Sequence, residues 1–457
     1  MKQFRKQIHM VGIGGAGMCP IAELLHESGH MVTGSDMQRT EATQRLEAAG
    51  IKIQYDHTPL LARSADLLIY SSAVKTDNLE RVFAAENGIP EMRRAEVLGD
   101  LMRNHFTVCV SGTHGKTTTT SLIGALFCDA EENPTVLVGG MLRNTGSHAV
   151  IGKGRVMIVE ADEYDRSFLA MYPSIAIITN IEADHLDCYN DLDDIKNTFV
   201  QFTERVPFYG AVIACIDDPG VRDILPGIER TIITYGLQEN ADYRAVNVKS
   251  ADAQCVFDVL HKNTMLGSIK LNLPGMHNLR NALACIASGM EMGIDFETIY
   301  KTLSSFEGVK RRYEILGTFG GVTVIDDYAH HPGEIKATLE AAMNGGYKRV
   351  FAVFQPHLYS RTRDFMDGFV SSLSLADKVL ITDIYKAREL PIEGVDASMI
   401  AKRLEGTGHA YVDFFKNKST IISHLKNNVE PGDAVVFMGA GDICKTALNF
   451  AKELRGE

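Results

Sequence analysis

A lysine that follows a glycine-bounded turn is the most informative feature of the sequence. Residues 112–118 read Gly-Thr-His-Gly-Lys-Thr-Thr and come directly after an apolar run. Glycines let backbone N–H groups approach phosphate oxygens, and the start of a helix adds positive partial charge. Lys116 can bridge the β- and γ-phosphates, and the Thr117 hydroxyl can bind Mg²⁺. Although the two glycines stand closer together than in the usual phosphate loop, the segment predicts a nucleoside triphosphate site.

Acidic residues and a histidine follow the next apolar runs along the chain. Glu160, Asp162 and Glu163 end one run, and Asp184 and His185 follow another. In doubly wound sheets, ligands bind at the carboxyl ends of the strands, and Mg²⁺ prefers oxygen ligands. These residues are therefore candidate metal ligands beside the phosphate loop, and helix caps are the structural alternative.

The first glycine-rich loop of the chain lies near the N-terminus, and residues 112–118 form the second loop. Residues 12–17 read Gly-Ile-Gly-Gly-Ala-Gly, and Asp36 follows about 20 residues later, as in a dinucleotide-binding fingerprint. The pattern predicts a site for a ligand that carries a diphosphate and a ribose. NAD and a UDP-sugar both satisfy it, and so does a plain tight turn.

Basic and aromatic residues follow apolar runs in the C-terminal third. Arg312 precedes one such run, Tyr328 and His330 follow it, and Arg361 and Arg363 follow the next. Arginine recognises carboxylate and phosphate through two parallel hydrogen bonds. These residues are candidate substrate contacts, and surface charge or helix capping is the alternative.

The elements that must position these residues alternate between short apolar strands and helices, which predicts an α/β protein with buried parallel sheets. Residues 243–273 alternate polar and apolar side chains, which predicts a small antiparallel sheet. A length of 457 residues corresponds to roughly three domains. We place them at residues 1–105, 106–308 and 309–457.

Composition narrows the class of protein. The chain carries 46 Lys and Arg against 58 Asp and Glu, a net charge of -12, whereas nucleic-acid binders have a basic face. We therefore expect no nucleic-acid partner, and anionic ligands must bind at local sites.

The eight cysteines are scattered, which predicts free thiols. No apolar run approaches the ~20 residues that span a bilayer, so we expect a cytoplasmic protein without a membrane partner.

The motifs, taken together and in order, resemble those of the Mur ligase family, the ATP-dependent amino-acid ligases of peptidoglycan precursor synthesis. The resemblance covers essentially the whole chain. It implies a Rossmann-like N-terminal parallel sheet, a central P-loop-type parallel sheet with the small antiparallel sheet, and a Rossmann-like C-terminal sheet. Residues 12–18 and 355–363 are similar to the branch that joins L-alanine to UDP-N-acetylmuramate. A rival branch attaches a whole tripeptide to the same nucleotide sugar.

The resemblance also implies ATP and Mg²⁺ as cofactors and assigns roles to residues. It places the nucleotide on the second loop and on the two later domains, at Gly112, Thr113, His114, Gly115, Lys116, Thr117, Thr118, His277, Asn281, Arg312 and Asp327. It places the nucleotide sugar and the amino acid at Gly14, Gly15, Ala16, Gly17, Met18, Asp36, Ser72, Tyr328, His330, Arg361 and Arg363. Its catalytic residues are Lys116, Glu160, His185 and Arg361, and its metal ligands are Thr117, Glu160 and His185.

Other readings stay open at this point. Some family members use a carbamylated lysine, but Lys196 is out of register with it, so we predict none. A nucleotide-dependent oxidoreductase would bind its cofactor at residues 12–17, but this function does not explain the phosphate-type loop at residues 112–117. A non-catalytic nucleotide sensor would bind ATP without turnover. We expect a monomer or a weak dimer.

Overall fold

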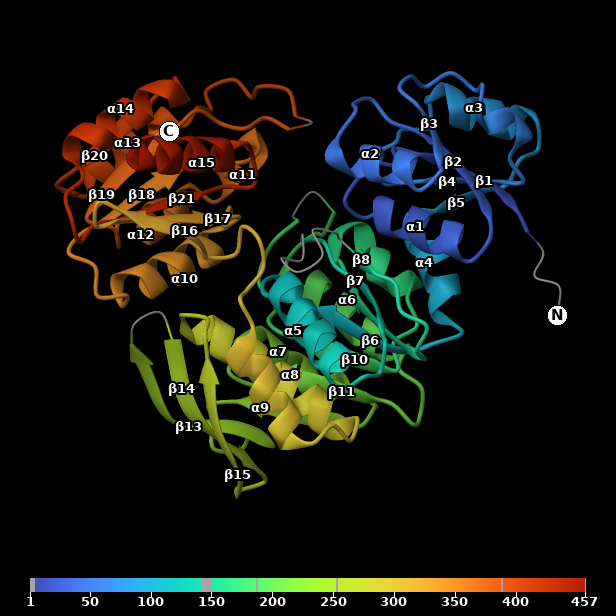
Figure 1. Cartoon of the computed structure of the whole chain (residues 1–457), viewed down its shortest axis with the longest axis horizontal. Helices are drawn as coiled ribbons and strands as arrows, with labels where there is room; N and C mark the ends of the chain where they lie inside the picture. The colour runs from blue at the N-terminus through green and yellow to red at the C-terminus, as the bar shows by residue number, and fades with distance from the viewer. Residues whose placement is uncertain (1–4, 141–148, 186–187, 252–253, 388, 457) are drawn as a thin grey trace. The chain divides into compact units, whose positions relative to one another are not determined.

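The computed structural model describes residues 5–140, 149–185, 188–251, 254–387 and 389–456 (Figure 1). The chain forms two compact units. The first contains Met1–Arg244, Leu260–Met265 and Leu283–Thr302, and the second contains Ala245–Val259, Leu266–Ala282 and Leu303–Glu457.

The N-terminal sheet is parallel, and its strand order reverses beside the first glycine-rich segment. The order is β3-β2-β1-β4-β5, so β1 (Gln7–Val11) pairs with β2 (Met31–Ser35) on one side and β4 (Leu67–Tyr70) on the other. Such a reversal opens a crevice at the carboxyl end of the central strand. The remaining elements are β3 (Lys52–Gln54), β5 (Glu91–Arg93), α1 (Cys19–Glu27), α2 (Glu41–Ala48), α3 (Leu79–Glu86) and α4 (Arg94–Met102).

The central sheet places the second glycine-rich segment between two strands that end in polar residues. Strand β6 (Phe106–Ser111) pairs in parallel with β9 (Val156–Glu160) and with β10 (Ile175–Ile178). The four residues of β10 are all buried, as expected for a parallel strand covered on both faces. The other elements are α5 (Lys116–Asp129), β7 (Thr135–Leu137), β8 (Ala149–Val150), α6 (Leu192–Thr203), β11 (Ala211–Cys215), α7 (Pro219–Ile224), β12 (Ile232–Gly236), α8 (Met276–Glu291) and α9 (Phe296–Ser305).

Residues 243–273 form three consecutive strands, as the alternating pattern predicted, and these strands are part of the central sheet. Strands β13 (Tyr243–Ala251), β14 (Gln254–His261) and β15 (Thr264–Leu271) continue the central sheet, whose ten strands run β15-β14-β13-β12-β11-β10-β6-β9-β7-β8. Strand β13 joins through a short parallel pairing, in which Tyr243 and Arg244 face β12. Lys262 and Asn263 link β14 to β15 with positive φ at both residues, the geometry of a two-residue antiparallel hairpin.

The C-terminal sheet has six strands in the order β16-β17-β21-β18-β19-β20, and its β16 edge is antiparallel. Strand β17 (Val322–Asp327) is buried throughout and pairs in parallel with β21 (Ala434–Met438). The other elements are β16 (Glu314–Phe319), α10 (Pro332–Met343), β18 (Val350–Phe354), α11 (Tyr359–Asp364), α12 (Met366–Leu373), β19 (Lys378–Thr382), α13 (Ser398–Gly406), β20 (Val412–Phe415), α14 (Lys418–Asn428) and α15 (Ile443–Arg455).

These sheets confirm the predicted three-domain α/β class, while the proposed boundaries near residues 105 and 308 stay a prediction. All eight cysteines are free thiols, as expected. Within the described residues, no helix has both the length and the hydropathy that crossing a membrane requires.

Candidate active site

The turn after β6 has a backbone that only glycine accommodates. Gly112 has φ +131°, and a Cβ atom placed on it would lie 2.1 Å from the Thr179 hydroxyl oxygen. Gly115 has φ +82° and is the N-cap of α5, so no side chain covers the first N–H groups of that helix. A helix start without a side-chain cap leaves backbone donors for an anion. The turn therefore has a backbone suited to an anion, and its contact with a triphosphate stays a prediction.

Side chains that follow β10 hold this turn in place. The His114 N–H donates to Oδ1 of Asn180 at 2.8 Å, and the Thr179 hydroxyl donates to the His114 carbonyl at 2.6 Å. The Glu182 N–H donates to the Thr113 hydroxyl at 2.9 Å. Because the turn is tied to the neighbouring strand, its backbone donors are fixed before a ligand arrives.

Lys116 lies across the turn and forms an ion pair with Glu163. Its Nζ donates to the Gly112 carbonyl at 2.6 Å and to the Glu163 carboxylate at 2.8 and 3.0 Å. Burial lowers the pKa of an amine, but the carboxylates of Glu163 and Asp162 outweigh it, so the pKa of Lys116 is raised. The lysine is therefore a fixed positive charge at neutral pH.

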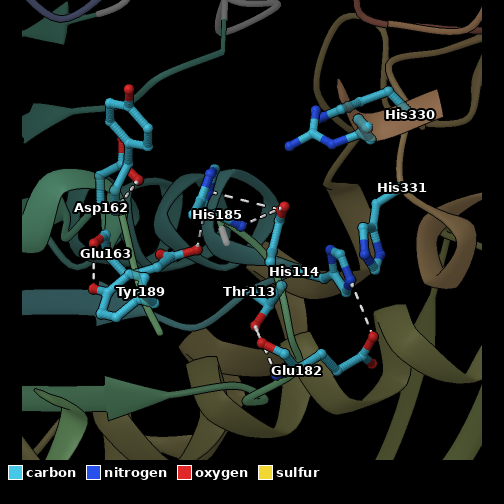
Figure 2. Close-up of polar contacts among 12 residues, drawn as sticks. Thr113, His114, Asp162, Glu163, Glu182, His185, Tyr189, His330 and His331 are labelled. Carbon is cyan, nitrogen blue, oxygen red and sulfur yellow. Dashed lines mark hydrogen bonds and ion pairs between the residues drawn. The ribbon is translucent and has the colours of Figure 1, made fainter. Parts of the chain in front are cut away.

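Three residues beside Lys116 bring their ligand atoms together. Ligand atoms of Asp162, Glu163 and His185 lie within 4.8 Å of one another, and Figure 2 shows these side chains on one side of the turn. His185 Nε2 is 3.8 Å from Oε1 of Glu163. Two carboxylates and an imidazole at this spacing can hold a divalent cation. The sequence assigned the metal to Thr117, Glu160 and His185; the structure places Thr117 in the first turn of α5 and Glu160 at the end of β9.

The first glycine-rich segment borders a cavity of about 530 Å³ in the first unit. The Gly14 N–H donates to Oδ2 of Asp36 at 2.8 Å, so the acidic residue of the fingerprint holds the loop itself. The cavity lining includes Gly14, Gly15, Asp36, His57 and Asn78. Its mixture of backbone and polar side chains suits a nucleoside.

A second cavity of about 290 Å³ connects the first loop to the carboxylates of β9. Gly15 and Ser71 line both cavities, and the second is also lined by Arg94, Glu160 and Asp162. Ala16, Gly17 and Met18 complete its wall on the side of α1. The predicted Ser72 is exposed, and its neighbour Ser71 occupies the lining position. A ligand that enters by the first loop can therefore extend to Glu160.

Arg94 is a functional candidate that the sequence did not reveal. Its guanidinium lies 3.0 to 3.2 Å from the Cβ position of Gly17. Within the described part of the chain it has no hydrogen-bond or ion-pair partner. A half-buried arginine that lies against Gly17, just before α1 begins, favours an anionic ligand.

In the second unit, Asn281 and Asp327 are engaged with the chain itself. The Asn281 side-chain amide donates to Oδ1 of Asn278 at 3.3 Å. The Asp327 carboxylate accepts from the Tyr313 N–H at 3.0 Å and from the Ala329 N–H at 2.8 Å. Burial raises the pKa of Asp327. Asp327 thus fixes the turn after β17, and its predicted contact with a nucleotide stays a prediction, as do those of His277 and Asn281.

The other predicted residues of the second unit divide into a cluster and an outlier. The His330 ring lies 5.7 Å from the ring of His357, whose Nδ1 is 3.5 Å from Nη1 of Arg361. Arg312 lies over the Tyr328 ring at 5.2 Å, and Tyr328 meets His330 edge to face. Arg363, by contrast, forms an exposed ion pair with Asp364 at 2.7 Å.

Sequence reasoning missed several residues for different reasons. Asp162 and Glu163 stand in the acidic segment that the sequence singled out, but spacing alone did not show which carboxylate would face Lys116. His57 and Arg94 belong to no motif, so no sequence signal identified them. Only the cavities place them beside the first loop.

Family models match the chain in three consecutive segments. Residues 7–106 match "Mur ligase family, catalytic domain", residues 110–289 match "Mur ligase middle domain", and residues 311–441 match "Mur ligase, glutamate ligase domain".

Relatives match over nearly the whole length. The UDP-N-acetylmuramate–L-alanine ligase of Salinibacter ruber is 49% identical over 99% of this chain and 96% of its own. That of Geotalea uraniireducens is 44% identical over 99% of both chains.

Solved structures agree. The UDP-N-acetylmuramate–alanine ligase of Thermotoga maritima has a TM-score of 0.84 at 29% identity and covers 99% of this chain and 100% of its own. A murein peptide ligase of Psychrobacter arcticus has a TM-score of 0.72 at 26% identity and covers 98% of both chains. The chain therefore belongs to the Mur ligase family.

Proposed function

We propose that this chain uses ATP to join L-alanine to the lactyl carboxylate of UDP-N-acetylmuramate, a step of peptidoglycan precursor synthesis. The observation that carries the proposal is the cavity lined by Gly15, Arg94 and Glu160. It offers one path from a loop suited to a diphosphate to the carboxylates beside Lys116. Relatives at 41–49% identity that bear the name of this activity support it.

The reaction needs an activated carboxylate because a free carboxylate is a poor electrophile. ATP transfers its γ-phosphoryl group to the lactyl carboxylate, which gives an acyl phosphate and ADP. The amine of L-alanine attacks the acyl carbon, loses a proton, and displaces inorganic phosphate as the amide bond forms. Lys116 and the start of α5 would stabilise the negative charge of the transferred group.

The residues beside Lys116 fit a magnesium ion, because two carboxylates and an imidazole converge there. Thr117, Glu160 and His185 would hold the metal, together with Asp162 and Glu163. When bound, Mg²⁺ would neutralise phosphate charge and orient the acceptor carboxylate.

The first loop would hold the nucleotide sugar. Residues Gly14 to Met18 would surround the diphosphate, with the backbone N–H groups of Ala16 and Gly17 and the Arg94 guanidinium as donors, while Asp36 would face the ribose. This gives residues 1–105 the role of a nucleotide-sugar domain. In the second unit, Tyr328, His330 and Arg361 would contact the amino acid, and His277, Asn281, Arg312 and Asp327 would contact ATP.

An assay of phosphate release tests this function. ATP, Mg²⁺ and UDP-N-acetylmuramate are mixed with L-alanine, with other single amino acids, or with a peptide, and release without acceptor is the control. We expect release that depends on both the nucleotide sugar and L-alanine. Release without either would reject the ligase.

A second candidate activity is the attachment of a whole tripeptide, since the murein peptide ligase of Psychrobacter arcticus has nearly the same fold. The same assay separates the two. Turnover with the tripeptide and none with L-alanine would reject our choice in favour of this one.

A further inference from the structure

A buried carboxylate lies behind the nucleoside cavity, where it has no part in the proposed chemistry. Glu80, in the first turn of α3, is fully buried with fully buried His9 and Ser35 beside it. A buried carboxylate is stable only when donors satisfy it.

Four side chains converge on the two oxygens of Glu80. Oε1 is 2.9 Å from Nε2 of His9 and 3.3 Å from the Gln54 amide nitrogen. Oε2 accepts from the Ser35 hydroxyl at 2.7 Å and is 2.7 Å from Nδ1 of His57. An ionised carboxylate only accepts hydrogen bonds, so it can satisfy all four of these side chains as donors. A protonated carboxyl group would use one oxygen as a donor and leave one of them without an acceptor. We therefore treat Glu80 as ionised.

The carboxylate determines which nitrogen of His57 carries the proton. An ionised carboxylate only accepts, so Nδ1 of His57 must donate its hydrogen to Oε2 of Glu80. In a neutral imidazole the other nitrogen, Nε2, is then an acceptor. The two ring nitrogens point in different directions, and Nε2 has no partner within the described residues. Since His57 lines the cavity of about 530 Å³, its acceptor is available to a ligand there.

We propose that Glu80 fixes the tautomer of His57 so that Nε2 accepts a hydrogen bond from the imide N–H of uracil, which makes the nucleoside cavity select uracil over cytosine. The inference rests on the proposed function for its ligand, a uridine nucleotide. Uracil carries a hydrogen at N3, whereas cytosine has a lone pair there. Asp36 lines the same cavity and is the natural partner of the ribose, which leaves the base to His57.

A lone pair facing a lone pair costs more than a lost contact. A site built to accept a hydrogen from its ligand discriminates strongly against an analogue that lacks it. We expect UDP to bind roughly 10- to 100-fold more tightly than CDP. Glu80 is a positioning residue in this scheme, and His57 is the residue that contacts the base.

Calorimetric titration of the full chain with UDP and with CDP tests the proposal. In Glu80→Gln the amide can donate to Nδ1 of His57, so the ring can hold its hydrogen at Nε2. We expect the UDP-to-CDP affinity ratio to fall by about tenfold or more in this variant and in His57→Ala. Glu86→Gln makes the same chemical change at an exposed position of α3 and should keep the wild-type ratio.

A spectroscopic measurement separates tautomer control from simple structural support. Nitrogen-15 shifts of the His57 ring should show the hydrogen on Nδ1 in the wild type and a shift of population toward Nε2 in Glu80→Gln. If Glu80→Gln fails to fold, the wild-type ring assignment and the ratio in His57→Ala still decide.

A wild-type hydrogen on Nε2, or an unchanged ratio in His57→Ala, would overturn the inference. In a folded Glu80→Gln variant, a ratio equal to that of the wild type would also overturn it. Failure of wild-type protein to bind UDP at all would instead overturn the proposed function, so the two failures are distinguishable.

Discussion

The two glycine-rich loops of the first unit lie at equivalent places, each after a central parallel strand, yet they handle charge differently. The loop after β6 has Lys116, and Glu163 neutralises it at 2.8 Å. The loop after β1 has no lysine, and Asp36 accepts from its backbone at 2.8 Å. The first loop thus relies on backbone donors and on Arg94 from a distant helix, whereas the second has a cation of its own.

This difference indicates a division of labour. A binding loop has to recognise a diphosphate that does not react, and backbone donors suffice for that. A reacting phosphoryl group gains charge stabilisation in the transition state, for which a fixed cation and a metal are more effective. Mutations in the two loops should therefore have separable effects.

Metal removal should produce the largest difference between the effect on ligation and the effect on UDP affinity. With excess EDTA, we expect ligation to fall below detection, because the second loop would lose the ion held near Asp162 and Glu163. UDP affinity, measured by calorimetry, should stay unchanged because the first loop needs no metal. Excess Mg²⁺ added back should restore ligation. An equal loss of UDP affinity would contradict the division.

Lys116→Ala should reduce kcat for ligation by about 10³-fold. The substitution removes the lysine ammonium that pairs with Glu163 and that would stabilise the transferred phosphoryl group. UDP affinity should be retained. Initial rates of phosphate release and calorimetry check both values. If both fell together, the loops would not be independent sites.

Substitution of glycine by alanine should be more harmful in the second loop than in the first, because the backbone of the second loop requires glycine. In Gly112→Ala the new Cβ would meet Thr179 at 2.1 Å with φ at +131°, so we expect kcat/KM for ATP to fall roughly 100-fold.

Gly14→Ala is the matched change in the first loop. Its Cβ would meet the Thr43 methyl at 2.6 Å and Asp36 at 2.9 Å, but its backbone, unlike that of Gly112, does not have a positive φ. We expect a smaller rise in KM that is confined to the nucleotide sugar. Steady-state kinetics with each substrate varied in turn provides the comparison, and a Gly14→Ala effect on KM for ATP would argue against it.

Arg94→Ala should have the smallest effect. We expect UDP affinity to fall about tenfold, because a charge-assisted contact to the diphosphate is lost. Arg63→Ala, which removes an exposed arginine of the same domain, serves as the control. Unchanged UDP affinity in Arg94→Ala would show that backbone donors alone hold the diphosphate.

Much of the fold could be predicted because its signals are local. Strands β19 and β21 are short apolar runs that the sheet buries, and such runs between helices are what indicated parallel sheets in the sequence. The attachment of β13 to the central sheet could not be predicted. It depends on Tyr243 and Arg244 reaching the edge of β12, which no local pattern encodes.

The candidate site divides in the same way. Lys116, Gly112 and Gly115 lie within five residues, so their chemistry can be read from their order. The partner of Lys116 is Glu163, 47 positions away. The acidic segment and the family resemblance favoured Glu160 as the functional carboxylate, and no local signal indicated that Glu163 would meet Lys116. Arg363 lies in the same short motif as Arg361, but one turns to Asp364 and the other toward His357.

The sequence by itself determined the α/β class, the two phosphate-type loops and the membership of a ligase family, because each depends on residues that are close in the chain. The tertiary structure decided which carboxylate meets Lys116, where Arg94 lies, and that Glu80 and His57 share a hydrogen bond across 23 positions. Those contacts depend on how strands pair and helices pack, and burial then fixes the charge and hydrogen-bond state of each group.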